Sequence, residues 1–397
     1  MRANPGGTIT GEAIIGRDEE IGDIWRLLEK QSVLLVAERR IGKTSLLRKM
    51  CEHPRNNWVP LMCWVEQCAH PIDCVERIYH QAAKMQVKSK KGVWLKHIRS
   101  AYKAISGLEI AGWQLPPIKS DWKHLLGALI RDIAENTDKR ILIVLDEFPL
   151  MISKVGGIPE TGPALAMDFL DTLRGLRQEF DPTDRVRYVL SGSIGLHLVL
   201  ETLRTEHKHK SNPVSDMRTF ILSGMGRADV QEMCYRHLDE EHITRRNPEA
   251  FDERIFSLTD GLPLCLQHIF EAFQRDGRTE VTPDDVDRTV QTLLNNRGLD
   301  GFIYAAQRLD SYYAKLGLQP MADSILGLLS NASDYVAEKT IIEFVESRIA
   351  VENERTVCAV LELLQDDQYL VRDASTGERR YRFRYNILRQ WWKTNRG

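Results

Sequence analysis

The sequence lacks any long hydrophobic run. No stretch of roughly 18 consecutive apolar residues occurs in its 397 residues, so no membrane-spanning helix is predicted. The first residues, Met1 to Gly7, contain no apolar segment of the kind that secretory signals carry. We therefore expect a cytoplasmic protein without a membrane partner.

Paired cysteines are also missing. The seven cysteines are scattered, and none form a C-x-x-C pair. Cys63, Cys68 and Cys74, with His70 and His80, do not have the spacing of a standard zinc site, so reduced thiols in the core are the favoured interpretation. An odd number of cysteines agrees with a reducing cytoplasm.

A strong charge of either sign is absent as well. The net charge is −2, so the chain as a whole has no electrostatic attraction to nucleic acid. Internal repeats and low-complexity segments are missing too. With 43% hydrophobic residues, the chain is long enough for one to three domains with sizeable cores.

A phosphate-binding loop is the most informative motif that is present. Residues Ala37 to Ser45 read A-E-R-R-I-G-K-T-S and follow the apolar run from Val33 to Val36. In the pattern G-x-x-x-x-G-K-[ST] after a buried strand, backbone N–H groups surround a phosphate. The Lys reaches the β- and γ-oxygens, and the Ser or Thr hydroxyl ligates Mg²⁺. The sequence therefore assigns these roles to Lys43 and Thr44, with the phosphate at a helix N-terminus.

One position of the loop departs from the pattern. Ala37 stands where the first glycine is expected, and alanine is comfortable only at negative φ, so the entry to the loop is expected to differ slightly. The predicted nucleotide-contacting residues of the loop are Ala37, Glu38, Arg39, Arg40, Ile41, Gly42, Lys43, Thr44 and Ser45.

The second half of the predicted site follows a second apolar run. Ile141 to Leu145 read as a central parallel strand buried on both faces. Asp146 and Glu147 follow at its carboxyl end, where ligands bind in open α/β sheets. We expect Asp146 to hold Mg²⁺ through water and Glu147 to act as the general base.

A third strand is predicted at Val186 to Leu190, followed by S-G-S-I-G-L. A polar residue at its end would lie between the nucleotide-carrying strands and sense the γ-phosphate. Ser191 and Ser193 are the candidates, and Ser193 is assigned to the catalytic set. A plain Ser-Gly turn is the alternative.

Together these motifs resemble the prokaryotic AAA+/STAND-type ATPases, often called the archaeal ATPase family. The resemblance covers roughly residues 12 to 392. It rests on the loop, on Ile15 to Glu20, L-D-E-F at 145–148, S-G-S-I-G-L, Asp216 to Arg218 ahead of Phe220 to Leu222, and Gly261 to Leu264. The last of these is similar to the G-x-P turn in the lid of STAND and Orc/Cdc6-like ATPases. The resemblance implies a nucleotide-driven switch or remodeller and names no substrate.

The resemblance also extends the list of site residues. The segment from Ile14 to Arg17 is expected to lie over the adenine, with Ile15 and Gly16 as the assigned contacts, and the resemblance implies that Pro263 belongs to the nucleotide-contacting turn of the lid. It further implies an arginine that acts between neighbouring subunits, for which Arg204 and Arg218 are candidates. Solvated arginines are the alternative for both.

The expected fold class is α/β: a P-loop NTPase core of the AAA+/STAND type with a parallel sheet, an α-helical lid and a C-terminal winged-helix domain. The predicted segments are an N-terminal linker with the first helix at 1–30, the ATPase core at 31–222, the lid at 223–300 and the winged helix at 301–397. Residues 149–163, rich in glycine and proline, are expected to be a loop beside the active site.

The winged-helix prediction rests on three short helices at 322–329, 337–347 and 353–365. Alternating segments at 369–373 and 379–384 follow, on either side of a Ser-Thr-Gly turn typical of a hairpin. A final helix is expected at 387–393.

Binding of DNA is left open by these segments. The wing carries Arg379, Arg380 and Arg382, whereas the third helix is acidic, with Glu354, Glu362, Asp366 and Asp367. A helix that reads DNA carries cations or amides at the base edges, so contact through the wing without sequence readout is expected if DNA binds. Packing on the ATPase core or on a partner is the alternative. The basic stretch from Lys84 to Lys103 admits nucleic acid or an ordinary amphipathic helix.

The sequence thus predicts an enzyme that binds ATP and Mg²⁺ and hydrolyses ATP to ADP and phosphate. The first functional hypothesis is a signalling or defence-type switch that acts through a protein partner or through self-oligomerisation. The alternative is a loader or remodeller that engages duplex DNA through Arg379, Arg380 and Arg382. A sensor without hydrolysis is a third hypothesis, which the Asp146-Glu147 pair disfavours.

Overall fold

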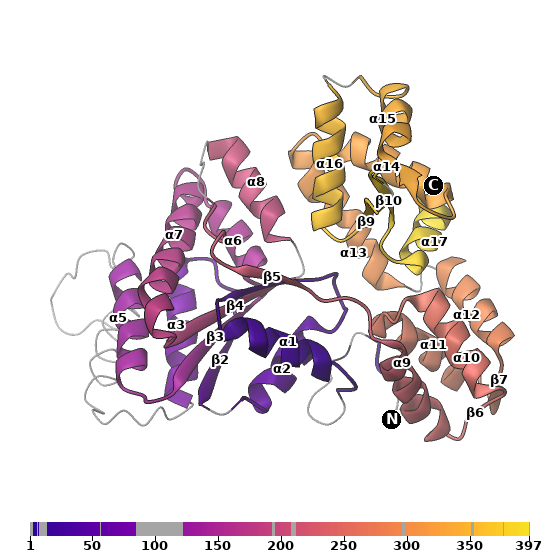
Figure 1. The fold of residues 1–397 in the computed structure, drawn as a ribbon, viewed down its shortest axis with the longest axis horizontal. Coiled ribbons are helices and arrows are strands. Elements are labelled where there is room, and N and C mark those ends of the chain that lie inside the picture. Colours follow the sequence, from indigo (N-terminus) through magenta and orange to yellow (C-terminus); the bar gives the residue numbers. More distant parts are fainter. Residues whose placement is uncertain are drawn as a thin grey trace. The chain divides into compact units, whose positions relative to one another are not determined.

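The computed structural model describes residues 3–5, 7, 14–55, 57–84, 122–192, 195–207, 212–295, 299–350, 353–375 and 377–396. The chain divides into two compact units. One combines Asp18–Val36 with Leu46–Ile221, and the other combines Met1–Arg17, Ala37–Ser45 and Leu222–Gly397. We call them the sheet unit and the helical unit and describe each by itself (Figure 1).

The sheet unit is built on a parallel five-stranded sheet with the order β2-β3-β4-β1-β5. The strands are β1 (Val33–Val36), β2 (Trp58–Trp64), β3 (Arg140–Asp146), β4 (Val186–Gly192) and β5 (Arg218–Ile221). The strand predicted before Asp146 is confirmed as β3, and it lies between β2 and β4. Because β1 and β3 both pair with β4 in parallel, their carboxyl ends lie at the same edge of the sheet.

Both faces of this sheet are covered. Ile143 of β3 is in register with Tyr188 of β4, and both side chains belong to one large core. The next residues, Val144 and Val189, are equally buried. Since successive side chains of a strand point to opposite faces, burial of both sets shows a sheet that is covered on either side, as parallel sheets are.

The helices of the sheet unit are α1 (Asp18–Leu28), α2 (Lys43–Glu52, which starts in the phosphate-binding loop), α3 (Pro71–Lys84), α5 (Trp122–Glu135), α6 (Phe148–Gly156), α7 (Gly162–Phe180) and α8 (Leu196–His207). Helices α3, α5 and α7 pack against one another beside the sheet (Figure 1). Their buried side chains join those of the strands in the core.

The prediction of a loop at 149–163 is wrong, because α6 occupies Phe148–Gly156. Pro149 lies in the first turn of this helix, where a proline costs no hydrogen bond. Phe148, Met151, Ile152 and Val155 are buried at helical spacing. The helical spacing of the apolar residues is therefore a better predictor of the structure here than the glycine and proline content.

The first part of the helical unit contains α9 (Arg227–Cys234), a π-helical turn (Tyr235–Asp239), α10 (Pro248–Thr259), α11 (Pro263–Arg275) and α12 (Pro283–Asn295). The helical character predicted for this region is confirmed, and three of its helices begin with proline, whose fixed φ suits the first helical position. A short parallel pair of strands, β6 (Thr244–Arg245) and β7 (Glu280–Val281), was not predicted.

The C-terminal region, residues 299–396, completes the helical unit. Its helices are α13 (Asp300–Arg308), which runs into a π-helical turn (Leu309–Tyr313), α14 (Gln319–Asn331), α15 (Glu338–Glu346), α16 (Glu354–Asp366) and α17 (Asn386–Asn395). The predicted hairpin is confirmed: β9 (Leu370–Asp373) and β10 (Arg380–Phe383) pair antiparallel, and β8 (Val336–Ala337) extends the sheet. Helix α13 was not predicted.

Asp260 connects the two parts of the helical unit. It caps α10 in the left-handed conformation, and its carboxylate accepts the backbone N–H of Asn386 at the start of α17. Burial raises the pKa of Asp260 to about 6, although the N–H groups of Asn386 and Ile387 act in the opposite direction. The next residue must be glycine, since a Cβ on Gly261 would lie 2.2 Å from the carbonyl oxygen of Met225.

Replacing Asp260 with Asn is expected to change how stability depends on pH. Because the pKa of the folded carboxyl (about 6) is above its ordinary value of 3.8, its contribution to stability is complete below about pH 4 and is lost as the pH rises through 6. The variant should therefore gain about 2 to 3 kcal/mol relative to the wild type between roughly pH 4 and pH 7. Thermal unfolding midpoints across this range measure the difference. Asp276→Asn at an exposed position is the control. If the difference in unfolding midpoint between Asp260→Asn and the wild type does not change with pH, the prediction is contradicted.

Candidate functional site

The phosphate-binding loop has the backbone that its sequence requires. Arg40 has a φ of 62° and Gly42 a φ of 95°, whereas Ala37 is not among the described residues with positive φ. The alanine at the first glycine position therefore causes no backbone strain. A Cβ on Gly42 would have no atom within 4 Å, so the positive φ, and not crowding, favours glycine there.

Polar groups of the loop bond to one another in this structure. Nζ of Lys43 donates to the carbonyl oxygens of Ala37 and Glu38, at 3.0 and 2.8 Å. The backbone N–H of Arg39 donates to Oε1 of Glu38 at 2.9 Å. A cation and an amide that the motif assigns to phosphate oxygens thus have acceptors within the loop.

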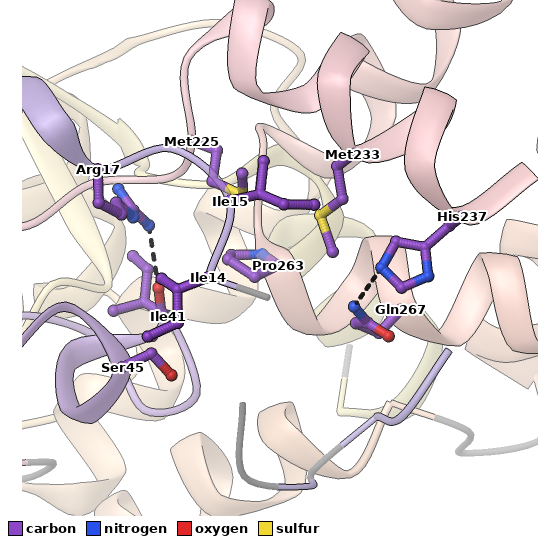
Figure 2. Close-up of a pocket in the computed structure, with 11 residues that line it drawn as sticks. Ile14, Ile15, Arg17, Ile41, Ser45, Met225, Met233, His237, Pro263 and Gln267 are labelled. Carbon is purple, nitrogen blue, oxygen red and sulfur yellow. Dashed lines mark hydrogen bonds between the residues drawn. The ribbon is translucent and has the colours of Figure 1, made fainter. Parts of the chain in front are cut away.

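A pocket of about 60 Å³ lies beside the loop within the helical unit (Figure 2). It brings together the predicted residues Ile15, Ile41, Gly42, Ser45 and Pro263. Its other lining residues are Ile14, Arg17, Met225, Met233, His237 and Gln267. Ile14 and Arg17 belong to the segment predicted to lie over the adenine, whereas no local motif marks the other four, because they come from segments far apart in the sequence.

Gly16 and Arg17 fix the N-terminal wall of this pocket. A Cβ on Gly16, which has a φ of 67°, would lie 2.4 Å from the carboxyl carbon of Asp229. The buried guanidinium of Arg17 donates to the carbonyl oxygens of Ile41 and Ser223, each at 2.9 Å. Arg17 therefore ties the loop to the N-terminal segment and to the chain that enters α9. Sequence reasoning did not assign this role.

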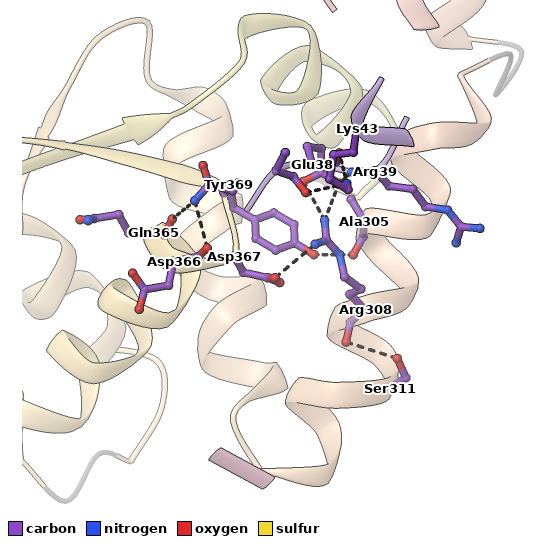
Figure 3. A network of polar contacts seen from close by, with 12 residues as sticks. Glu38, Arg39, Lys43, Ala305, Arg308, Ser311, Gln365, Asp366, Asp367 and Tyr369 are labelled. Carbon is purple, nitrogen blue, oxygen red and sulfur yellow. Dashed lines mark hydrogen bonds and ion pairs between the residues drawn. The ribbon is translucent and has the colours of Figure 1, made fainter. Parts of the chain in front are cut away.

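A buried ionic network joins the loop to the C-terminal region (Figure 3). Nη2 of Arg308, at the end of α13, donates to both carboxylate oxygens of Glu38, at 2.6 and 2.7 Å. Nη1 donates to Oδ1 of Asp367 at 3.2 Å. The exposed fractions of Glu38, Arg308 and Asp367 are 3%, 8% and 2%.

The surroundings of Arg308 keep it charged. Its guanidinium lies 5.0 Å from the centre of the Tyr369 ring, whose hydroxyl donates to the carbonyl oxygen of Ala305 at 2.6 Å. Burial opposes the charge on Arg308, but the carboxylates of Asp367 and Glu38 outweigh it, so the pKa of Arg308 lies well above its ordinary value.

Two carboxylates follow β3 in the sheet unit, in different environments. Asp146 is fully buried, and its Oδ1 accepts the backbone N–H of Glu147 at 3.1 Å. Glu147 is partly exposed and has a φ of 59°, which is uncommon for a residue with a side chain. Such strain concentrates at functional sites. A buried and a partly exposed carboxylate side by side suit two different chemical roles.

The remaining predicted site residues are less informative. Ser193 lies outside the described residues, as does most of the stretch from Lys84 to Lys103. Ser191 is buried at the end of β4. Arg218 is exposed at the start of β5, and Arg204 lies 3.6 Å from Glu201 in α8.

The arginines of the predicted wing already have partners. Arg379 lies 3.8 Å from Glu338, and Arg380 pairs with Asp373. Arg382 is exposed and lies over the Tyr335 ring at 4.9 Å. Two of the three cations are therefore partly neutralised by neighbouring carboxylates.

Cys63, Cys68 and Cys74 are buried free thiols. Burial raises the pKa of Cys63 to about 12 and that of Cys68 to about 11, so both are protonated at neutral pH. Within the described part of the chain, no three His, Cys, Asp or Glu side chains cluster as metal ligands would. No helix in that part is long and apolar enough to cross a membrane.

Comparison with known proteins identifies the fold. No family model and no curated protein matches the sequence. Among solved structures, a Walker-type ATPase of Pyrococcus abyssi matches with a TM-score of 0.60 and 17% identity over 98% of this chain and 99% of the other. The chain has a P-loop NTPase fold.

Two further solved structures match with lower scores. A STAND protein with a tetratricopeptide repeat sensor from Pyrococcus horikoshii has a TM-score of 0.38 and 16% identity, over 97% of this chain and 43% of that protein. The RuvB Holliday junction branch migration motor of Thermotoga maritima has a TM-score of 0.37 and 13% identity, over 90% of each chain.

Replacing Arg17 with Met is expected to lower stability by about 2 kcal/mol, because the carbonyl oxygens of the buried Ile41 and of the exposed Ser223 lose a charged donor. Urea unfolding, followed by tryptophan fluorescence, measures this loss. Arg26→Met removes an arginine whose side chain is 70% exposed and should cost no more than about 0.5 kcal/mol. Equal effects of the two substitutions would refute the role assigned to Arg17.

Proposed function

We propose that the chain is a Mg²⁺-dependent ATPase that works as a molecular switch, in which the nucleotide state of the phosphate-binding loop controls its C-terminal region. The P-loop NTPase fold supports the nucleotide part of this proposal. The observation that carries the switch is the buried ion pair between Glu38 of the loop and Arg308 of α13. In this proposal residues 223–300 are the lid and 301–397 a winged-helix domain.

Binding of a phosphate would disturb this ion pair directly. Phosphate oxygens would compete with the carbonyl oxygens of Ala37 and Glu38 for Lys43, and with the Glu38 carboxylate for the N–H of Arg39. Both changes remove contacts of Glu38, the residue that Arg308 holds, and so favour its release. Rearrangement of the loop around a phosphate would thus change the surroundings of its contact with the C-terminal region.

The energetic asymmetry of the network makes it suitable for a switch. Arg308 serves two buried carboxylates. Loss of Glu38 would leave Arg308 paired with Asp367, whereas loss of Arg308 would leave two buried carboxylates without their cation, at a cost of about 3 to 5 kcal/mol. Release of Glu38 alone is therefore the less costly way to open the contact.

The residues assigned to hydrolysis have suitable chemistry. Lys43 would neutralise charge that develops on the phosphates, and the partly exposed Glu147 would accept a proton from the attacking water. The hydroxyl of Thr44 and the buried carboxylate of Asp146 are oxygen donors of the kind that Mg²⁺ prefers. When bound, Mg²⁺ would supply positive charge that stabilises the transferring phosphoryl group. Ser193 and Arg218 are further proposed members of this set.

We propose that the output passes through a protein partner or through self-association. The arginines of the predicted wing support a DNA contact less well, because Arg379 and Arg380 face Glu338 and Asp373. Exposed ion pairs are weak, so this pairing lowers the expected affinity for phosphates without blocking them. Stimulation of ATP hydrolysis by duplex DNA would reverse our preference.

Hydrolysis is tested with Lys43→Ala and Glu147→Gln. The first variant should lose nucleotide binding because it removes the cation of the loop. The second should bind ATP and hydrolyse it at least roughly 100-fold more slowly, because it removes the general base. Steady-state phosphate release and equilibrium nucleotide binding separate the two effects. Unchanged turnover in Glu147→Gln would remove this residue from the mechanism.

The switch is tested with Arg308→Met and Glu38→Gln, measured by hydrogen exchange of α13 and α16 with no nucleotide, ADP or ATP. Nucleotide should speed exchange in the wild type. Without nucleotide, α13 and α16 of Arg308→Met should exchange fast. Their exchange in Glu38→Gln should be intermediate between that of the wild type and that of Arg308→Met, since Glu38→Gln leaves the Asp367 pair intact. Arg355→Met, at an exposed position of α16, is the control. If neither nucleotide nor the Arg308→Met substitution changes the exchange rates of α13 and α16, this coupling is ruled out.

A further inference from the structure

Gln267 lines the pocket beside the loop, where its side-chain amide would face the edge of a bound base. It projects from α11 one turn after Pro263, so both residues lie on the same face of the helix. Its side chain is 4% exposed. The pocket around it is mainly apolar, with Ile15 and Met233 among its walls. A polar amide among the few polar groups of a mainly apolar pocket can fix the orientation and identity of a flat ligand.

The hydrogen bonds of Gln267 establish which of its atoms accepts. The backbone N–H of Asn4 donates to Oε1 of Gln267 at 2.7 Å. Nε2 of Gln267 lies 3.0 Å from Nε2 of His237, a contact that Figure 2 shows. Since a backbone N–H can only donate, the atom that faces Asn4 is the oxygen. The amide nitrogen therefore donates to His237, and Nε2 of His237 is the unprotonated ring nitrogen.

The packing of His237 keeps this orientation fixed. His237 belongs to the π-helical turn that follows α9 and is 1% exposed. Its ring stacks on Phe270 of α11, with centroids 5.1 Å apart and an interplanar angle of 19°. Single π-helical turns within α-helices often mark functional sites. Gln267 is thus held by a partner that packing prevents from turning.

We propose that Gln267, oriented by His237, makes the site select adenine over guanine. Oε1 accepts a hydrogen bond from the amino group at C6 of adenine. Guanine and hypoxanthine carry a carbonyl oxygen at C6, so two acceptors would face each other and neither would be satisfied. This inference rests on the proposed nucleotide site and names the residue that determines its base specificity.

The size of the pocket sets a condition on base entry. Its 60 Å³ is less than half of the roughly 150 Å³ that admits a benzene ring, so the walls must move. Met225 and Met233 line the pocket and have unbranched side chains that repack readily. Oε1 has two lone pairs, so it accepts from a base beside the N–H of Asn4 or in its place.

The test is calorimetric binding of four diphosphates to the full chain: ADP, purine riboside diphosphate, IDP and GDP. Purine riboside lacks any group at C6 and should bind roughly 3- to 10-fold more weakly than ADP. IDP should bind roughly 10- to 100-fold more weakly than ADP, because it adds an unpaired acceptor. IDP and GDP should be similar, which places the discrimination at C6 and not at the 2-amino group of guanine.

Substitution of Gln267 completes a thermodynamic cycle in which the residue and the C6 group of the ligand are each changed. In Gln267→Leu and in the volume-conserving Gln267→Met, the affinities for ADP, purine riboside diphosphate and IDP should converge to within about threefold. Gln231→Leu, at an exposed position of α9, should keep the wild-type ratios. If neither Gln267 variant folds, the wild-type difference between ADP and purine riboside diphosphate still decides the point.

The outcomes separate base selection from the nucleotide site itself. If the wild type binds all four diphosphates equally and Lys43→Ala binds none, the role of Gln267 is overturned and the site stands. A full ADP preference in Gln267→Leu or Gln267→Met would also overturn it. If the wild type binds no nucleotide, the proposed function fails as well.

Discussion

The contact between the phosphate-binding loop and the C-terminal region depends on one buried guanidinium. Arg308 holds Glu38 on one side and Asp367 on the other, and all three are almost completely removed from water. Burial of ionised groups is costly, so each member is stable only while its partners remain. Release of Glu38 leaves Arg308 paired with Asp367, so the network has a closed and an open arrangement, which is the property that a two-state switch needs.

The same network carries an unbalanced charge. Two carboxylates share one cation, so the cluster is net negative at a residue of the loop, while the ligand proposed for that loop is an anion. An arriving phosphate would raise the local negative potential and weaken the hold on Glu38 in addition to competing for Lys43. Electrostatics and hydrogen bonding therefore favour the same response to nucleotide in this proposal.

The parts predicted from the sequence are those with a local signal. The five apolar residues before Asp146, the G-K-T loop and the alternating hairpin at 369–384 each carry a recognisable period or motif, and the strand and hairpin were confirmed. Arg308, Gln267 and His237 have no such signal, since their partners lie far along the chain. Asp367 was counted among the acidic residues of the third predicted helix, yet it is buried against an arginine 59 residues away. The helix at 148–156 was missed because glycine and proline were weighted above the apolar period.

In this proposal the phosphate end and the base end of a bound nucleotide would each affect the C-terminal region, through separate contacts of the helical unit. The phosphate end would act through Glu38 and Arg308. The base end would act through α11, which carries Gln267 and follows the turn where Asp260 accepts the first N–H of α17. A ligand with only one of these ends, such as adenosine or pyrophosphate, would engage only one contact. The C-terminal region would thus respond fully to an intact nucleotide and only partly to its fragments, because each contact involves a different helix of that region.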